Sequence, residues 1–296
     1  MRGTIIMISS LSAVADIFEI LADAVIVVDE AGRIAYANGA VQRVLGYAPT
    51  ELTGRPLDAL VPEEYRVPHR LHMQAFREQG RPRAMGQRPV LYALGKSGRE
   101  VPVSIAISNL YTEGRCFSVA VVRDASVVRD RLTEAIAQAE SDSLTGIGNR
   151  LYLSRRIRKS LASGRPFGLL FLDLRHFKRV NDEHGHKVGD ELLRLVARRI
   201  QSLVRAEDAA VRLGGDEFVI FFDRISESEP LAMRAAAIVA SIEKPFLIGD
   251  TSGTIGVSIG GAIHPRDGGS EEALIAAADR NMYRARHAGA AYCGDP

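Results

Sequence analysis

Short apolar runs separated by turn residues fill the first half of the chain, and this pattern is typical of strands joined by tight connections. Five such runs are bounded by Gly, Asp or Ser and contain several β-branched residues. The runs span residues 24–29, 33–37, 90–94, 101–107 and 116–123. The pattern predicts a five-stranded antiparallel sheet with helices between its second and third strands.

From residue 141 onward the chain alternates apolar runs with amphipathic segments. Residues 168–174 are apolar almost without interruption, which predicts a buried strand, and apolar residues recur every three or four positions over 189–204, which predicts a helix. The other expected elements are a helix capped by Ser141 or Asp142, a helix over 177–184, a hairpin over 211–222, a helix over 230–244, a strand over 255–262 and a helix over 270–287. This order predicts an α/β arrangement with a mixed central sheet.

Residues 126–141 connect the two patterns and show no strand signal. Val128, Leu132, Ala135 and Ala139 recur with four-three-four spacing, which is a heptad-like stripe. The stripe predicts a helix that pairs with a second copy in a short parallel coiled coil; a single helix packed on its own domain is the alternative. We therefore expect a two-domain α+β protein, with domains at 11–125 and 142–296 and a helical linker at 126–141.

Composition narrows the class of protein. A chain of 296 residues exceeds what one ordinary core needs, and a formal net charge of +2 argues against a nucleic-acid-coating or membrane-binding surface. The two cysteines, Cys116 and Cys293, have neither metal-ligand spacing nor the spacing of a disulfide framework. The apolar stretch at 5–8 is too short for a signal peptide, and acidic residues interrupt the one at 11–28. We expect a cytoplasmic protein without membrane insertion or nucleic-acid partners.

Two glycines and two carboxylates, from Gly214 to Glu217, stand between two apolar runs. A phosphate can approach backbone amides closely where no Cβ intrudes, and adjacent carboxylates supply the hard oxygens that Mg²⁺ prefers. The alternative is a hairpin loop with solvated acids, for which Gly-Gly-Asp is also suitable. The turn alone favours neither interpretation.

Asp173 ends the apolar run 168–174, at a strand end where ligand sites commonly form in layered sheets. A carboxylate that follows such a run needs a positive partner, and Mg²⁺ would provide one. The short helix after it begins near Lys178, and its free amides and positive end suit an anion. These features extend the hypothesis of a metal and phosphate site.

Asn181 and Asp190 are expected to face one loop, because Gly185 would end the first helix and Gly189 would begin the next. A carboxylate can accept hydrogen bonds from both N1–H and N2–H₂ of guanine, whereas adenine offers no such donor pair. Helix capping is the alternative role for Asp190.

Five short motifs follow one another in the first half, at 29–34 (DEAGRI), 36–38 (YAN), 45–47 (LGY), 51–55 (ELTGR) and 98–103 (GREVPV). In their order and spacing they resemble the PAS sensor family. His69 lies where oxygen-sensing PAS domains carry their proximal histidine, so the resemblance suggests haem b as one candidate ligand. A small apolar ligand, or no ligand, is the alternative.

Four segments of the second half, at 142–150, 173–190, 212–218 and 257–260, resemble the GGDEF family of diguanylate cyclases over residues 141–290. The resemblance implies a fold akin to the palm of nucleotidyl cyclases and polymerases. It also implies condensation of two GTP into cyclic di-GMP and two pyrophosphates, in a homodimer because each chain offers one GTP site. Two Mg²⁺ per site, or Mn²⁺ in their place, are the implied cofactors.

The same resemblance assigns roles to individual residues. Metal binding falls to Asp173, the Leu174 carbonyl, Asp216 and Glu217; catalysis falls to Asp216, which would deprotonate the ribose 3′-OH, with Glu217 assisting. Substrate binding falls to Phe177, Lys178, Asn181, His186, Asp190, Gly214, Gly215 and Arg286.

Three positions depart from the family pattern. Arg175 stands where a second acid is frequent, Arg286 where Lys is usual, and Ala290 where a basic residue is frequent. These departures weaken the expected grip on the triphosphate but leave the metal-binding acids intact.

Arg205 and Asp208 match the Arg-x-x-Asp inhibitory product site of the family in its register with Gly214. A surface salt bridge three residues apart is the alternative. The expected protein is therefore a bacterial, signal-regulated diguanylate cyclase with product inhibition. The rival functions are a catalytically weak or inactive receptor that binds cyclic di-GMP through this pair, and a cyclase for ATP, which Asp190 disfavours.

Overall fold

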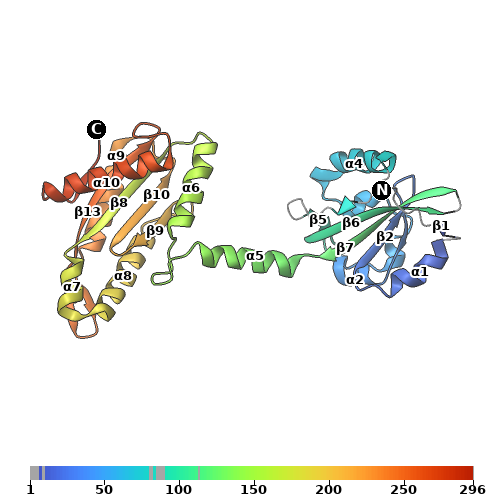
Figure 1. Ribbon diagram of the computed structural model, residues 1–296, viewed down its shortest axis with the longest axis horizontal. Helices are drawn as coiled ribbons and strands as arrows, with labels where there is room; N and C mark the ends of the chain where they lie inside the picture. The colour runs from blue at the N-terminus through green and yellow to red at the C-terminus, as the bar shows by residue number, and fades with distance from the viewer. Residues whose placement is uncertain (1–6, 9–10, 80–82, 85–90, 113, 296) are drawn as a thin grey trace. The chain divides into compact units, whose positions relative to one another are not determined.

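The computed structural model describes residues 7–8, 11–79, 83–84, 91–112 and 114–295 (Figure 1). The chain divides into two compact units, residues 1–134 and 135–296. The helix α5, Ser126–Ala139, contains the division. Each unit is described by itself below.

The N-terminal unit is built on one sheet, in the order β1-β6-β7-β2-β3, with β4 and β5 also paired to β6. The expected five strands are present and antiparallel, and two two-residue strands add to them, of which β1 runs parallel to β6. The strands are β1 Met7–Ile8, β2 Ala24–Val28, β3 Ile34–Ala37, β4 Arg83–Ala84, β5 Leu91–Leu94, β6 Glu100–Thr112 and β7 Arg115–Asp124. The predicted fold of this half is confirmed.

Helices cover this sheet between β3 and β5, as the sequence predicts. Gly46 ends α2 with φ 80°, and Pro49 begins α3, where its missing N–H costs nothing. The helical elements of the unit are α1 Leu11–Glu19, α2 Ala40–Leu45, α3 Pro49–Leu52, η1 Leu57–Leu60, η2 Glu63–Tyr65 and α4 Arg66–Gln79. Leu45, Leu52 and Leu60 bury their side chains against β2 and β3 and form the core.

The C-terminal unit has a five-stranded sheet in the order β14-β13-β8-β10-β9, in which only the β13–β14 pair is parallel. This mixed sheet confirms the prediction. Its strands are β8 Phe167–Arg175, β9 Ala209–Gly214, β10 Glu217–Asp223, β13 Gly256–His264 and β14 Tyr292–Cys293, and a separate hairpin joins β11 Phe246–Ile248 to β12 Thr251–Gly253.

Two core clusters fill the two faces of this sheet. One face packs on α8 and α9, and the other on α6 and α10. The helices are α6 Arg150–Ala162, α7 Phe177–His184, α8 His186–Gln201, α9 Ser228–Ile242 and α10 Glu271–His287. Because β8 is central, the residue at its end lies next to both neighbouring strands.

Two predicted helix starts are wrong. No helix begins at Ser141 or Asp142; instead Asn149 caps α6, and its side chain accepts hydrogen bonds from the amides of Leu151 and Tyr152. The α8 helix begins at His186 instead of Gly189, because the positive φ of Gly185 (84°) lets one residue end α7 and start α8.

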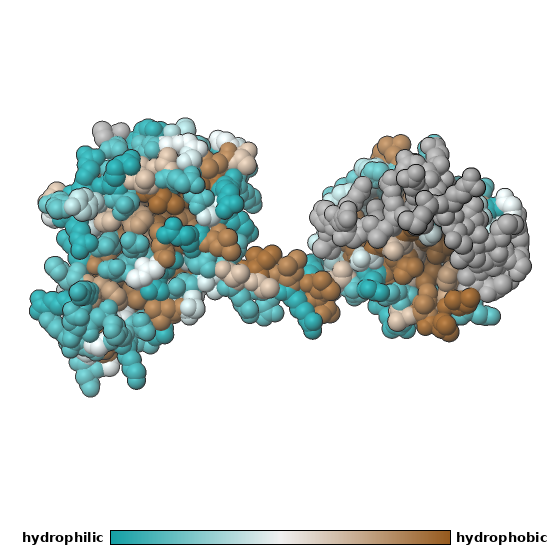
Figure 2. Space-filling view, viewed as in Figure 1, coloured by the Kyte–Doolittle hydropathy of each residue, from teal (hydrophilic) through white to brown (hydrophobic). Residues whose placement is uncertain are grey.

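The helix α5 has no buried residue, and its exposed surface is largely apolar (Figure 2). Four large apolar side chains are exposed on it, including Val127 at 62%. Val128 is 69% exposed, Leu132 57% and Ile136 45%. No helix in the described part of the chain is long and apolar enough to cross a membrane.

Candidate active site

Four residues lie side by side near the ends of four neighbouring strands of the C-terminal sheet. Ser258 on β13 is opposite Asp173 on β8, Asp173 is opposite Glu217 on β10, and Glu217 is opposite Gly214 on β9. Directly opposed residues of antiparallel strands present their side chains on the same face. The fold therefore brings Asp173 and Glu217 together, although 44 residues of sequence separate them.

The glycine turn beside these carboxylates has an open backbone. Gly214 and Gly215 both have positive φ, 144° and 54°, and no atom lies within 4 Å of the position that a Cβ would take. Arg212 braces the turn: its Nε donates to the Gly215 carbonyl at 3.0 Å, and its Nη1 donates to both Asp142 oxygens at 3.1 Å. The turn is thus anchored to the loop before α6, and both of its glycines are exposed.

The pKa values of two of these carboxylates, Asp173 and Glu217, are raised. Burial raises the pKa of Asp173, and the charge of Asp216 raises it further, whereas Arg286 lowers it. Burial and the charge of Asp216 likewise raise the pKa of Glu217. The cause is a concentration of negative charge, to which Asp279 on α10 also contributes. The site therefore favours a cation.

Arg286 supplies that positive charge in this structure. Its Nη1 donates to Asp173 Oδ1 at 2.8 Å, from the last turn of α10, and Asp173 is 14% exposed in the pair. Sequence reasoning did not foresee this contact, nor the part played by Asp279. Asp279 lies seven residues before Arg286 and hence on the same helix face, which is the signal that would have found it.

The donor set fits Mg²⁺ chemically. Within the described residues, no three His, Cys, Asp or Glu side chains already converge as a finished metal site would. Mg²⁺ commonly takes one or two protein carboxylates and completes its shell with water and substrate phosphate. Asp173 and Glu217, on adjacent strands with Asp216 beside them, match that pattern.

The predicted nucleotide-binding residues cluster around α7 and α8. Phe177 is buried at the start of α7, while Lys178 and His186 are exposed. A Cβ on Gly189 would overlap the Asn181 side chain, so Asn181 lies over Gly189, and Asp190 is exposed. Asn181 thus contacts the first turns of α8, next in sequence to Asp190, and a shared guanine site for the two side chains stays a prediction.

Arg175, which replaces an acid that is frequent in the family, has a structural partner. Its Nη2 donates to Glu243 Oε1 at 2.9 Å, and its guanidinium packs so closely over Gly256 that a Cβ there would overlap it. The Arg175 side chain therefore links the end of β8 to the end of α9. It supplies no carboxylate for a metal at this position.

Asp208 uses both carboxylate oxygens on the backbone. Oδ2 accepts from the Arg205 amide at 3.0 Å, Oδ1 accepts from the Asp223 amide at 3.1 Å, and the side chain is 8% exposed. The contact between Arg205 and Asp208 is made by the Arg205 backbone amide, and the Arg205 residue is exposed. Asp208 therefore braces the turn that presents Arg205.

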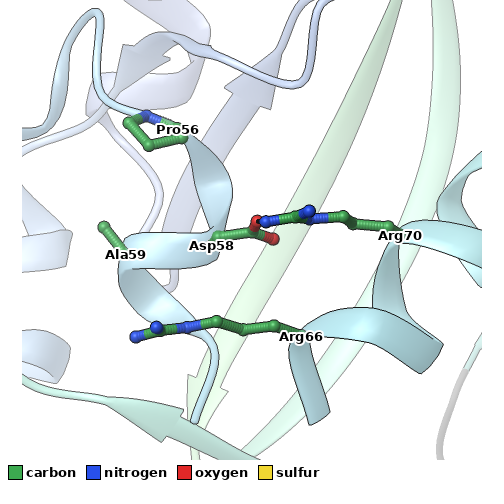
Figure 3. Close-up of a pocket in the computed structure, with 5 residues that line it drawn as sticks. All are labelled: Pro56, Asp58, Ala59, Arg66 and Arg70. Atoms are coloured by element: carbon green, nitrogen blue, oxygen red, sulfur yellow. Dashed lines mark hydrogen bonds and ion pairs between the residues drawn. The ribbon is translucent and has the colours of Figure 1, made fainter. Parts of the chain in front are cut away.

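His69 lies half-buried on α4 of the N-terminal unit, and burial lowers the pKa of its imidazole, which favours the neutral form. An open pocket of about 310 Å³ lies beside this helix (Figure 3). Pro56, Asp58, Ala59, Arg66 and Arg70 line it, and Arg70 pairs with Asp58 across it. His69 is not among the lining residues, so its role as a haem ligand stays a prediction.

Comparison with known proteins identifies one family in each half of the chain. A family model described as diguanylate cyclase, GGDEF domain, matches residues 139–291, and a PAS fold model matches residues 13–125. An uncharacterized signaling protein of Caulobacter vibrioides is 35% identical over 275 residues, which cover 89% of this chain and 32% of that protein.

Two further relatives match the C-terminal unit. The bifunctional diguanylate cyclase/cyclic di-GMP phosphodiesterase MucR of Pseudomonas aeruginosa is 41% identical over 165 residues, 54% of this chain and 24% of MucR. The crystal structure of the coiled coil and GGDEF domain of DgcB from Caulobacter crescentus, in complex with c-di-GMP, aligns with TM-score 0.52 and 27% identity, over 58% of this chain and 93% of that one.

The chain spans a third or less of the length of the two curated relatives. The family model nevertheless covers more than half of the chain, and both resemblances seen in the sequence are confirmed. The chain belongs to the GGDEF family of diguanylate cyclases and carries a PAS fold in its N-terminal half.

Proposed function

We propose that the protein is a signal-regulated diguanylate cyclase that condenses two GTP into cyclic di-GMP and two pyrophosphates. The observation that carries the proposal is the alignment of Asp173, Glu217 and the Gly214 turn on three adjacent strands. Carboxylates for a metal and amides for a phosphate lie together there, as phosphoryl transfer requires.

In the proposed mechanism, Asp173, the Leu174 carbonyl, Asp216 and Glu217 hold the metal ions. When bound, two Mg²⁺ stabilise the attacking and leaving oxygens of an in-line displacement at the α-phosphorus. Asp216 accepts the proton of the ribose 3′-OH, and the amides of the Gly214–Gly215 turn donate to the triphosphate. Arg286, which pairs with Asp173 in this structure, would pair with phosphate instead once another positive charge balances the Asp173 carboxylate.

Base selection falls to Asn181 and Asp190; the contact of Asn181 with Gly189, the residue before Asp190, supports a guanine site there. Incubation of the full chain with Mg²⁺ and GTP, ATP, or both, followed by HPLC, tests the function. Cyclic di-GMP from GTP alone is the expected product. A cyclic product from ATP would refute guanine selection, and no product from any mixture would favour the receptor function.

Homodimerisation belongs to the proposal, since each chain offers one GTP site and α5 exposes an apolar stripe. Leu132→Asp is expected to weaken the dimer at least about tenfold and to lower turnover with it. Burial of an unpaired carboxylate costs more than the ~1.4 kcal/mol that a tenfold change represents. Analytical ultracentrifugation measures the association, with Thr133→Asp, off the stripe on the same helix, as the control. Wild-type association of Leu132→Asp would contradict this interface.

Product inhibition is proposed to act through Arg205, whose exposed guanidinium can bind the acceptor edge of guanine. Arg205→Ala is expected to raise the inhibitory concentration of cyclic di-GMP about 10- to 100-fold, because bidentate base contacts contribute about 1–3 kcal/mol. Steady-state rates against added product measure the effect, with Arg198→Ala as a surface control on α8.

Asp208→Ala is a less informative variant. It would leave the part-buried amides of Arg205 and Asp223 without their acceptor, at a cost of up to about 1–3 kcal/mol. Loss of inhibition in that variant would mix binding with stability. Unchanged inhibition in Arg205→Ala, whose backbone contacts remain, would refute the product site.

Haem remains one proposal for the PAS ligand, on the strength of His69 alone. Protein expressed with haem supply is then expected to show a Soret absorption band that is lost in His69→Ala. His72→Ala, three residues further along α4, is the control and should keep the band. A colourless wild-type protein would contradict the proposal.

A further inference from the structure

Ser258 is a buried serine with no hydrogen-bond partner beside the proposed metal site. The residue is 0% exposed, and its Oγ has no hydrogen-bond partner among the described residues. Only one other buried side-chain atom of the described residues, Asn109 Nδ2 on β6, shares this condition. A buried hydroxyl without a partner costs folding free energy, so its presence requires an explanation.

Ser258 points to the same side of the sheet as Asp173. Alternate residues of a strand share a face, and Ala262 on β13 and Phe171 on β8 pack with Ala278 of α10 in one core cluster. Ser258 and Asp173 are in phase with these residues and lie directly opposite each other. Opposed Cβ atoms are about 4.5–5.5 Å apart, which lets a serine hydroxyl reach a carboxylate oxygen.

The Asp173 carboxylate is engaged elsewhere in this structure. Arg286 Nη1 binds Asp173 Oδ1 from the end of α10, and no hydrogen bond joins Asp173 to Ser258. Release of Arg286 would free the carboxylate to turn. The donor nearest in register is then the unpaired hydroxyl of Ser258.

We propose that Ser258 is a positioning residue that donates its hydroxyl proton to the Asp173 carboxylate once Arg286 has released it, and so holds Asp173 in its metal-binding orientation. The inference rests on the proposed function, because it takes Asp173 as a metal ligand. Hydrogen bonds to ligating carboxylates orient them and raise metal affinity. Arg286 and Ser258 are thus alternative partners of one carboxylate, before and after the nucleotide binds.

Ser258→Ala in the full chain tests the inference by metal binding. Mn²⁺ affinity is measured by electron paramagnetic resonance in the presence of a GTP analogue with a methylene group between the α- and β-phosphorus atoms. Affinity is expected to fall about tenfold. The thermal midpoint of the metal-free protein should stay unchanged or rise, because the substitution removes an unpaired buried hydroxyl.

Ser154→Ala is the matched control in the same domain. Ser154 lies on α6, and its hydroxyl donates to Glu271, which is not one of the proposed metal ligands. This variant should therefore lose stability and keep wild-type Mn²⁺ affinity. Wild-type Mn²⁺ affinity in Ser258→Ala would overturn the inference and leave the proposed function standing. No Mn²⁺ binding by the wild-type protein would overturn both.

Discussion

Asp216→Ala is expected to lower the rate of cyclic di-GMP formation at least about a thousandfold. The substitution removes a proposed metal ligand and the proposed general base together, and a general base alone contributes about 10²- to 10⁴-fold. Asp216 is also the charge that acts on both neighbouring carboxylates, Asp173 and Glu217. HPLC of the product, formed from GTP and Mg²⁺, measures the loss.

The loss of rate in Asp216→Ala should come without a decrease in the stability of the fold. The folded-state pKa of Asp173 and of Glu217 is raised, so their contribution to stability is fully present below the unfolded-state pKa and is lost as pH rises through the folded-state values. Removal of the Asp216 charge lowers both folded-state pKa values and reduces that loss. The metal-free variant should therefore be at least as stable as the wild type at neutral pH.

Carbon-13 NMR of the carboxyl groups checks the electrostatic part, as a shift of both titrations to lower pH in Asp216→Ala. Asp250→Ala, at the exposed turn between β11 and β12, is the control and should change neither rate nor titration. Wild-type turnover in Asp216→Ala would exclude the assigned chemistry.

Alternating and apolar patterns predicted the sheets well because burial dictates them. The run at 168–174 became β8, the centre of its sheet, and the turn at 214–217 joined β9 to β10 as expected. The pattern placed Asp173 at the end of one strand and Glu217 at the turn of the hairpin, and strand pairing put the two residues opposite each other. The sequence therefore indicated both acids but not the register that brings them together.

Contacts between distant side chains could not be predicted in this way. Arg286 reaches Asp173 only because α10 packs along β8, and nothing in the local sequence around either residue indicates the pair. Asp208 resembles half of an ion pair in sequence, yet its oxygens accept from two backbone amides, one of them 15 residues away. Both cases depend on the register of packed elements.

The prediction of the α6 start failed for a local reason. Ser141, Asp142 and Asn149 are all good capping residues, and the pattern alone does not rank them. Gly146, with φ 74°, lies between the early candidates and Asn149 and interrupts any helix from 142 onward. Asp142 instead accepts from Thr145 and Arg212, and Arg212 also donates to the Gly215 carbonyl of the glycine turn.

Gly260→Ala is expected to destabilise the C-terminal unit by at least about 3 kcal/mol, at the upper end of overpacking costs. A Cβ at this position would overlap the backbone of α10, at the Ala278 carbonyl and the Met282 amide. Backbone atoms cannot turn aside as a side chain can, so α10 would have to move, and Arg286 and Asp279 would move with it. Calorimetry of the full chain should show the corresponding transition about 6–12 °C lower.

Gly269→Ala is the matched control, because a Cβ there meets no atom within 4 Å and the residue does not have a positive φ. It should change stability by less than about 1 kcal/mol, and in the stabilising direction, since alanine restricts the unfolded chain. A wild-type transition in Gly260→Ala would mean that α10 does not lie against β13 as closely as this structure has it. The contact between Arg286 and Asp173 would then lose its support, because the same helix packing delivers it.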